Sequence, residues 1–410
     1  MADENKVYDL CVIGGGIAGA GAARDAALRG LSVVLLEKGA FASGASSKSS
    51  KLIHGGIRYL ETAAKAAGRG RLREAWKNFR FVFASLREAR TLETIAPALV
   101  RPVEILIPVY RGSSRGLFVV TAGALLYGVL AALSGHRYFP RILMGAAAVR
   151  KRLPGLELEG LRGGVLIQER LVDDRKLVEA TIESARSHGT EARERTEVTR
   201  FARSKEGLFE IEAKSGLSRP SYSARALIDA TGAWVDRTRS LGGGTGEPWI
   251  LPVAGAHIEL PRFAPVSALL EAEDHRLFFA VNIGDRVRVG TTERLERDPN
   301  AVKATDAEID YLLKSLRKFF PDCGAERSLI LASDAGVRPL SRSSEDKLGN
   351  ISREHEVRAS ADGALHLIGV KLTDHRRAAE EAVDRIVRHL AGTGRSFGPC
   401  RTAVTRLGLG

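Results

Sequence analysis

The stretch from Val7 to Lys38 constrains the fold most, because a continuous apolar run leads into a cluster of glycines and an alanine-rich segment. The apolar run predicts a strand that is buried on both faces of a parallel sheet. Gly14, Gly16 and Gly19 then form a GxGxxG pattern. This pattern permits a tight turn, a close approach of the backbone to a pyrophosphate, and a helix that lies against the strand. The N-terminus of that helix offers N–H groups and the positive end of its dipole, so we predict a dinucleotide site.

A second strand is predicted from Ser32 to Leu36, and it ends at Glu37. The Glu37 carboxylate falls about 20 residues after the glycines, where an acceptor for a ribose hydroxyl is expected. With strand, helix, second strand and terminal acid all present, a nucleotide site is favoured over an ordinary glycine turn. The fold class that follows is α/β.

Charge and cysteine content restrict the partners. The 410-residue chain has a formal net charge of +13, which favours phosphorylated substrates, anionic membrane surfaces or nucleic acid. No nucleic-acid-reading motif accompanies this charge, so we expect no nucleic-acid partner. The three cysteines are few and far apart, which argues against a disulfide framework and for a reducing compartment. The N-terminal MADENK is polar and acidic, so we expect no signal peptide and a cytoplasmic location.

The run from Leu117 to Leu133 bears on solubility, because its roughly 17 residues include no charge and lie at the bottom of the range for crossing a bilayer. A span would place the two halves of one enzyme-like chain on opposite sides of the membrane. A buried helix is therefore favoured, and a helix lying in the membrane interface and a true span stay open.

A loop rich in serine and glycine runs from Ser43 to Glu61 and carries more hydrogen-bond donors than a connecting loop needs. Its interspersed apolar residues, and the adjacent Arg58 and Tyr59, favour a ligand-binding loop over a flexible surface loop. The segment from about Thr62 to Ala96 is predicted to be one helix with an apolar stripe.

From Val165 the chain returns to the nucleotide pattern. Asp173 and Asp174 are predicted to cap a helix that begins near Arg175, and not to act as catalytic acids. A further apolar strand ends in the turn Ala230–Gly232, which we expect beside the same nucleotide.

The segment from Pro248 to Thr292 alternates between apolar and polar residues and indicates an antiparallel sheet with a hairpin turn at Gly284. This change of pattern marks a second domain. Thr305 and Glu308 form a predicted capping box.

The last third is predicted to rejoin the first domain. Arg338 lies between a glycine and a proline, on a predicted turn. Residues 365–376 predict a strand, a glycine turn and a helix that begins at Thr373 or Asp374. The tail from Gly392 is expected to be loose.

The chain resembles the FAD-dependent, aerobic-type glycerol-3-phosphate dehydrogenases, within the D-amino-acid-oxidase-like flavoproteins. The segment SSKLIHGGIRYLE carries the resemblance most specifically, and DATGAW, GTTE, AGVRPL and GVKLTDHR follow in the family's order. The resemblance implies a Rossmann-like FAD-binding domain assembled from discontinuous segments (1–95, 165–247 and 330–391). It also implies a substrate domain with a mainly antiparallel sheet (96–164 and 248–329), followed by a tail (392–410).

The resemblance also assigns residues to FAD. The implied cofactor-binding residues are Gly14, Gly16, Ile17, Ala18, Gly19, Glu37, Lys38, Ser46, Ser47, Ser49, Ser50, Lys51, Leu52, Gly55, Val198, Ala230, Thr231, Gly232, Trp234, Gly336, Arg338, Gly369, Lys371, Leu372 and Thr373.

For the substrate, the resemblance implies that Arg58 and Arg338 hold a phosphate, for which the planar fork of arginine is suited. Tyr59 would assist, and Lys371 would add positive charge at the reacting edge of the flavin. His257 would be a general base or a positioning group, with a purely structural role as the alternative. Arg338, His257 and Lys371 are thus the implied catalytic residues, and no metal site is expected.

The chain departs from the family at several points. GVKLTDHR stands where GGKLTTYR is usual, and GTTE stands where GTTD is usual. Many members also carry a helical C-terminal domain, which we expect this chain, ending at Gly410, to lack. These changes leave the prediction of FAD binding intact, whereas they weaken the prediction of the substrate.

The leading hypothesis is oxidation of sn-glycerol 3-phosphate to dihydroxyacetone phosphate, with electrons passed to membrane quinone. The enzyme would lie peripherally on the inner face of the cell membrane, and a homodimer is left open. One alternative is an FAD-dependent oxidase or dehydrogenase of another small anionic hydroxy or amino acid. Another, of a different class, is a flavin- or lipid-binding protein without turnover.

Overall fold

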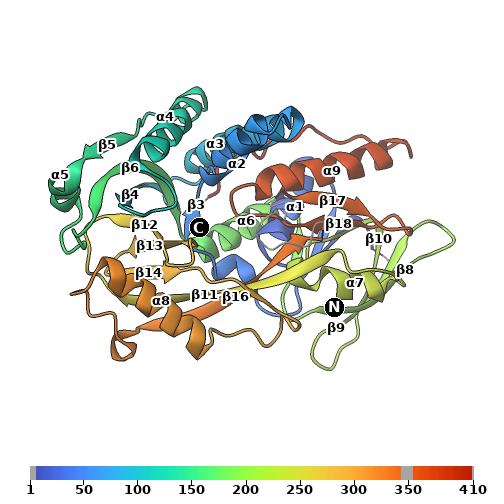
Figure 1. The fold of residues 1–410 in the computed structure, drawn as a ribbon. Coiled ribbons are helices and arrows are strands. Elements are labelled where there is room, and N and C mark those ends of the chain that lie inside the picture. The colour runs from blue at the N-terminus through green and yellow to red at the C-terminus, as the bar shows by residue number, and fades with distance from the viewer. Residues whose placement is uncertain (1–5, 343–353, 409–410) are drawn as a thin grey trace.

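The computed structural model describes residues 6–342 and 354–408, so most of the MADENK segment lies outside the described residues. Two sheets with their helices lie side by side (Figure 1). The predicted α/β class is confirmed, since one sheet contains parallel strands at its centre and the other is mainly antiparallel.

The first sheet is built on the predicted nucleotide motif. Its strand order is β17 (Glu356–Ala359), β18 (Leu365–Ile368), β10 (Ser221–Asp229), β1 (Val7–Ile13), β2 (Val33–Leu36) and β7 (Glu191–Arg193), with β9 (Phe209–Lys214) and β8 (Glu197–Arg203) continuing from β10. β1 pairs in parallel with both β10 and β2. All of its residues after Val7 are buried, as the continuous apolar run predicts.

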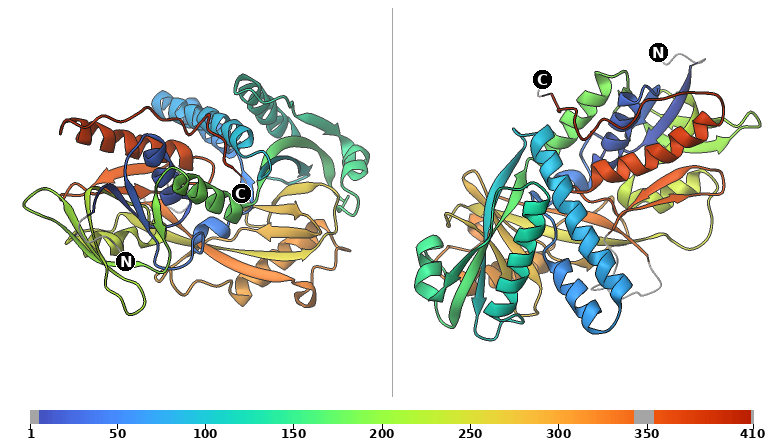
Figure 2. Two further views of the ribbon diagram at one scale, coloured as in Figure 1. Left: turned by 180° about the vertical axis from the view of Figure 1, so that it is seen from behind. Right: turned by 90° about the horizontal axis from the view of Figure 1, so that it is seen from above.

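Helices cover one face of this sheet. α1 (Ile17–Leu28) packs against α6 (Asp174–Arg186) and α9 (His375–Ala391), and the alanines of α1 contribute to the largest core cluster. α9 lies beside α1 in both views of Figure 2. On the other face, side chains of β8 and β9 pack against Tyr8, Cys11 and Ile13 of β1. α7 (Val235–Leu241) contacts β8, β10 and β18.

The second sheet is larger. Its order is β15 (Arg294–Leu295), β11 (Ile250–Pro261), β14 (Arg286–Gly290), β13 (Leu277–Ile283), β12 (Ser267–Glu271), β4 (Val100–Tyr110), β6 (Leu161–Val172) and β3 (Leu52–Ile53), with β16 (Ala332–Ser341) paired to β11 and β5 (Arg141–Met144) to β6. The β13–β14 hairpin turns at Gly284 as predicted. α8 (Asp306–Phe319) and α5 (Gly145–Arg152) pack on one face, and α4 (Leu117–Leu133) packs on the other. The capping box at Thr305 and Glu308 begins α8 as predicted.

Strand pairing bears on the predicted domain boundaries. β6 and β16 fall largely in segments that those boundaries give to the first domain, yet both pair within the second sheet. β16 lies antiparallel to β11 over its whole length. Arg338 is therefore on a strand, and its prediction as a turn residue was wrong. The division into two domains itself stays a prediction.

The predicted helix from Thr62 to Ala96 is two helices, α2 (Arg58–Gly68) and α3 (Leu72–Ile95). Gly70 separates them with a φ of +72°, a left-handed conformation that glycine adopts without strain.

The C-terminal tail is held in place, so its prediction as a loose segment was wrong. The guanidinium of Arg24 on α1 donates to the carbonyls of Thr402 and Thr405 at 3.3 and 2.6 Å. Leu407 is buried and its N–H donates to the carbonyl of Ile95 at 2.8 Å. Buried arginine needs acceptors, and tail carbonyls supply them here.

α4 is half-buried, and this differs from the expectation of a buried helix. Ala124, Tyr127 and Leu130 face the protein, while Phe118 and Leu133 are 85% and 70% exposed. Within residues 6–342 and 354–408, none of the helices combines the length and apolar character needed to cross a bilayer.

Candidate active site

A cavity of about 850 Å³ opens at the carboxyl ends of β1, β2 and β10. Gly14 and Gly16 line it from the turn before α1, and Glu37 lines it from the end of β2. Ligands of open parallel sheets bind in this position, at the strand ends and against a helix N-terminus. The cavity therefore fits an extended dinucleotide.

Two glycines of the motif, Gly14 and Gly19, leave no room for side chains. A Cβ on Gly19 would lie 1.8 Å from the carbonyl oxygen of Gly14, so α1 could not approach β1. Gly14 has a φ of +106°, and its Cβ would lie 2.7 Å from the carbonyl oxygen of Ala230. The close packing of α1 against β1 and β10 thus depends on these glycines, and the residues that line the cavity fit a bound FAD.

Glu37 is held by the turn that it borders. Its carboxylate accepts from the N–H of Gly15 at 2.6 Å and from the N–H of Gly39 at 2.8 Å. These bonds fix the carboxylate at the cavity wall, and its contact with a ribose hydroxyl stays a prediction.

A second cavity of about 370 Å³ adjoins the first, and Ser46, Lys48 and Gly336 line both. Its wall carries the basic side chains Lys48, Arg58, Arg276, Arg338 and Lys371. The acids on the same wall are Glu169, which is buried, and Glu293, which is partly exposed. Cations outnumber acids on the wall, so its charge favours an anion.

Arg338 and Lys371 are both fixed by neighbours. Arg338 donates through Nη2 to Thr291 Oγ1 at 2.7 Å and lies 3.4 Å from Glu293 Oε1 through Nη1. Lys371 Nζ lies 3.4 Å from the Tyr59 hydroxyl and 4.1 Å from the centre of the Phe81 ring. Such contacts limit the rotamers of both cations before a ligand arrives.

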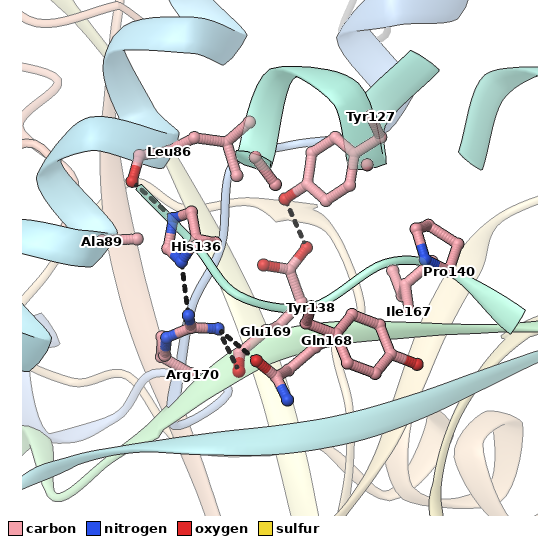
Figure 3. Close-up of a pocket in the computed structure, with 12 residues that line it drawn as sticks. Leu86, Ala89, Tyr127, His136, Tyr138, Pro140, Ile167, Gln168, Glu169 and Arg170 are labelled. Atoms are coloured by element: carbon pink, nitrogen blue, oxygen red, sulfur yellow. Dashed lines mark hydrogen bonds between the residues drawn. The ribbon is translucent and has the colours of Figure 1, made fainter. Parts of the chain in front are cut away.

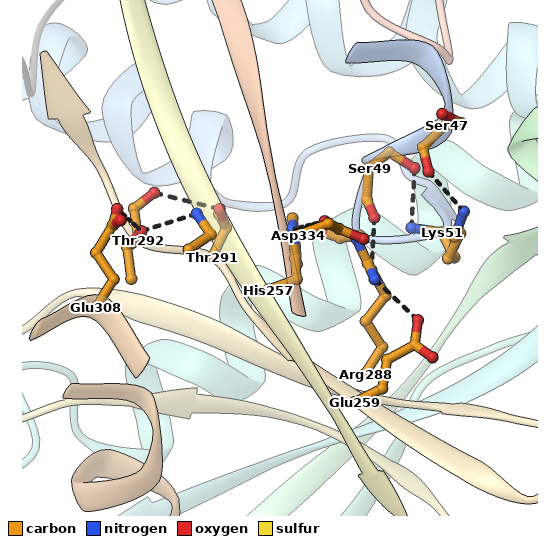
Figure 4. Close-up of polar contacts among 12 residues, drawn as sticks. Ser47, Ser49, Lys51, His257, Glu259, Arg288, Thr291, Thr292, Glu308 and Asp334 are labelled. Carbon is orange, nitrogen blue, oxygen red and sulfur yellow. Dashed lines mark hydrogen bonds and ion pairs between the residues drawn. The ribbon is translucent and has the colours of Figure 1, made fainter. Parts of the chain in front are cut away.

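His257 lies on β11 and is 3% exposed. Its Nε2 is 3.0 Å from Ser50 Oγ, while among the described residues its Nδ1 has no hydrogen-bond partner. Figure 4 shows the imidazole beside Asp334 and the Arg288 guanidinium.

Burial, with Arg288, Arg338 and Lys51 nearby, holds the pKa of His257 well below its usual 6.5. The imidazole is therefore neutral at pH 7, and it could accept a proton only by adding a cation among cations. These surroundings favour the positioning role over the general base, and both roles stay predictions.

The serine loop is fixed by one buried acid. Asp174 is fully buried, accepts from Ser49 Oγ at 2.6 Å and forms an ion pair with Lys51. Asp173 caps α6 by accepting from the N–H of Lys176, as predicted. Asp174 thus holds the loop against α6, which its prediction as a cap alone did not include.

The two cavities together are lined by every predicted site residue except Gly19, Ser47, Lys51 and Gly55. Gly19 acts through helix packing, and the Ser47 carbonyl accepts from Lys51 Nζ at 2.9 Å. The N–H of Gly55 donates to the Tyr127 hydroxyl at 2.9 Å. Direct FAD contact by Ser47, Lys51 and Gly55 stays a prediction.

Sequence reasoning did not select several residues that line the basic cavity. They are Lys48, His54, Arg276, Thr291, Phe279 and Glu293. GTTE contains Thr291 and Glu293, and its match to a family motif was the available signal. Arg276 lies in a polar turn between two strands, where no local pattern distinguishes it from solvent-facing residues.

A glycine-rich cradle at the ends of parallel strands, next to a basic cavity under an antiparallel sheet, defines a dinucleotide-dependent enzyme that acts on small anions. The family model for FAD dependent oxidoreductases matches residues 9–371. The chain belongs to the FAD-dependent glycerol-3-phosphate dehydrogenase family, within these oxidoreductases. Its cofactor is accordingly FAD, as predicted.

Curated relatives and solved structures support this assignment. The glycerol-3-phosphate dehydrogenase of Synechocystis is 36% identical, over 97% of this chain and 73% of that protein. The aerobic enzyme of Escherichia coli is 34% identical, over 95% of this chain and 75% of its own. The FAD complex of the glycerol-3-phosphate dehydrogenase from Bacillus halodurans has a TM-score of 0.77 at 26% identity, and the match covers 98% of this chain and 68% of that one.

Proposed function

We propose that the protein oxidises sn-glycerol 3-phosphate to dihydroxyacetone phosphate. The observation that carries the proposal is the basic cavity, with Arg58, Arg338 and Lys371 on its wall, which adjoins the dinucleotide cradle. Its size suits a three-carbon phosphate ester, and its family relatives bear the name of this reaction.

The chain's own residues divide the work. Bound FAD supplies the acceptor for the substrate's hydride. Arg58 and Arg338 bind the phosphate, because guanidinium groups grip phosphate oxygens in pairs. Lys371 and the N-terminus of α9, which begins at His375, place positive charge where negative charge develops. The apolar side chains of Ile167, Leu269 and Phe279 exclude water from one side of the cavity.

Anaerobic mixing of the purified holoprotein with glycerol 3-phosphate tests the proposal. We expect the flavin absorbance near 450 nm to be lost, because the substrate's hydride reduces the cofactor. Glycerol tests whether the phosphate is needed. L-lactate tests whether another anionic hydroxy compound also reduces the flavin. If the flavin stays oxidised with glycerol 3-phosphate but is reduced by another hydroxy or amino acid, that compound is the substrate instead.

The electron acceptor and membrane contact form a finer proposal. The exposed face of α4 consists of Phe118, Val119, Leu126, Val129 and Leu133. An apolar helix face of this kind, on a chain with net charge +13, suits an anionic bilayer that contains quinone. We propose that α4 lies on the bilayer surface and that quinone is the acceptor.

Vesicle flotation checks the bilayer contact. The protein is expected to float with phosphatidylglycerol vesicles, and the double substitution Phe118→Ser with Leu133→Ser is expected to reduce the bound fraction several-fold, because apolar area is lost. Leu217→Ser is the matched control, since Leu217 is exposed on the distant β9–β10 turn. Equal loss in the control, or no wild-type binding, contradicts the contact.

A further inference from the structure

Glu169 lies at the junction of two cavities. It belongs to β6, is 4% exposed, and lines both the basic cavity and a small interior cavity of about 10 Å³ beneath α4. A space of this size holds about one water molecule. The mechanism above gives Glu169 no task, although it is a buried acid on the wall where an anionic substrate would bind.

The carboxylate of Glu169 holds a tyrosine from α4. Tyr127 is 2% exposed, and its hydroxyl donates to Glu169 Oε1 at 2.7 Å (Figure 3). The same hydroxyl accepts from the N–H of Gly55 at 2.9 Å. The three groups form one chain of hydrogen bonds, from a loop N–H through a phenol to a carboxylate, and each bond in such a chain polarises the next.

Position 55 is shaped for this phenol. A Cβ on Gly55 would lie 2.5 Å from the Tyr127 hydroxyl oxygen and 2.7 Å from the side chain of Leu86. Only glycine therefore allows the loop to approach Tyr127 this closely. Three residues further along the chain, Arg58 begins α2, followed by Tyr59. Fixing Gly55 fixes the start of the helix that carries both side chains.

Burial governs the pKa of Glu169, and the hydrogen bond from Tyr127 and the nearby Arg170 charge oppose it without cancelling it. Arg170, the next residue on β6, is engaged with Glu93 at 2.8 Å and with the imidazole of His136. Among the residues described, the Glu169 carboxylate has no ion pair within 4.0 Å. The neighbouring loop presents His54, and α3 presents Glu93 with its ion-pair partner Arg90. Burial raises the pKa of Glu169 to about 7, so its charge changes near neutral pH.

We propose that Glu169 is a proton-linked positioning residue: through Tyr127 and the Gly55 N–H, its carboxylate holds the loop that presents Arg58 and Tyr59 to the substrate. The inference rests on the proposed function for the task of those two residues. A charged acceptor makes a hydrogen bond about twice as strong as a neutral one, so protonation of Glu169 loosens the chain.

Two effects of the carboxylate on anion binding have opposite signs. If it acts through the loop, an anion binds more tightly at high pH, when Glu169 is charged and the loop is held. If it acts only by direct repulsion, the anion binds more weakly at high pH. The sign of the pH dependence thus separates the two.

Sulfate binding to the holoprotein tests the proposal, because sulfate stays a dianion throughout and undergoes no turnover. We expect a several-fold lower dissociation constant at pH 8.5 than at pH 5.5, with a midpoint near pH 7, monitored by the flavin spectrum. Glu169→Gln and Tyr127→Phe should both remove this step. Tyr138→Phe is the matched control: Tyr138 lines the same small cavity, but its hydroxyl donates to the carbonyl of Leu166.

Hydrogen–deuterium exchange of the peptide containing Gly55 gives a second readout, which needs no ligand. Both test variants are expected to raise its exchange relative to the intrinsic rate, and the control is not. A step of opposite sign, a step that persists in Tyr127→Phe, or unchanged exchange overturns the proposal. Failure of the proposed function would instead appear as a flavin that glycerol 3-phosphate does not reduce.

Discussion

Replacing Arg338 with alanine is expected to lower kcat/KM for glycerol 3-phosphate by about 30-fold to several thousand-fold, equivalent to about 2–5 kcal/mol. The wild-type guanidinium lines the basic cavity and is fixed by Thr291 at 2.7 Å and Glu293 at 3.4 Å. The variant loses the fork that would grip the phosphate and also leaves Glu293 facing the anion without this partner. Steady-state kinetics with a dye acceptor, and stopped-flow reduction of the flavin, measure the loss.

Two further variants sharpen this result. Arg338→Lys keeps the charge without the planar fork and should fall between wild type and Arg338→Ala. Arg286→Ala is the matched control, because Arg286 is an exposed arginine of the same sheet that pairs with Glu259 and does not line the cavity. If Arg338→Ala keeps the wild-type kcat/KM, Arg338 does not bind the substrate. If the wild-type protein binds glycerol 3-phosphate but its flavin is not reduced, the protein is a binder without turnover.

Substituting Gly19 by alanine is expected to remove most of the bound FAD. The new methyl group would lie 1.8 Å from the Gly14 carbonyl oxygen, which is far inside van der Waals contact. Because the Gly14 carbonyl belongs to the backbone and cannot rotate aside, α1 must move away from β1, and its N-terminal N–H groups leave the pyrophosphate position. The ratio of absorbance at 450 and 280 nm in the purified protein measures the FAD content.

Two further glycine substitutions, with milder predicted clashes, distinguish misfolding from loss of the FAD cradle. Gly16→Ala meets only Ser46 Oγ, at 3.0 Å, and should retain part of the FAD. Gly123→Ala is the control: Gly123 lies in α4 with nothing within 4 Å of its added Cβ, so full FAD content is expected. Circular dichroism reports whether each variant is folded. A folded Gly19→Ala protein with wild-type FAD content would show that this motif does not hold the nucleotide.

The nucleotide half of the fold was readable from sequence because its signals are local. The apolar run of β1, the spacing of Gly14 and Gly19, and Glu37 all lie within one short stretch. The Gly284 hairpin and the Thr305 capping box are likewise encoded by neighbouring residues. Each predicts its structure without knowledge of distant segments.

What sequence reasoning missed depends on contacts between distant segments. The assignment of Lys51 to the cofactor stays a prediction, but its pairing with Asp174, 123 residues away, was not foreseen. The tail was expected to be loose because chain termini are often poorly ordered, but Arg24 holds it from α1. Arg338 was placed on a turn by its flanking glycine and proline, whereas pairing with β11 makes it part of a strand. Tertiary pairing overrides local signals in all three cases.

The candidate site followed mostly from family motifs. Arg58, Tyr59, Arg338 and Lys371 do line one cavity, although 313 positions separate the first from the last along the chain by their numbers. Glu169 carries no such motif. Its place is set by β6 pairing with β4 and by α4 covering that strand, which no local pattern encodes.

The pairing of β16 with β11 has a geometric consequence. Gly336 lines both cavities, and Arg338 lines the basic cavity. The two residues lie two positions apart on a single extended strand. Consecutive residues of a strand alternate in direction and rise about 3.3 Å each. The offset between Gly336 and Arg338 is therefore set by backbone covalent geometry. Deleting Val337 alone would turn the guanidinium to the opposite side of the sheet, whereas hinge motions of the surrounding loops would leave the offset unchanged.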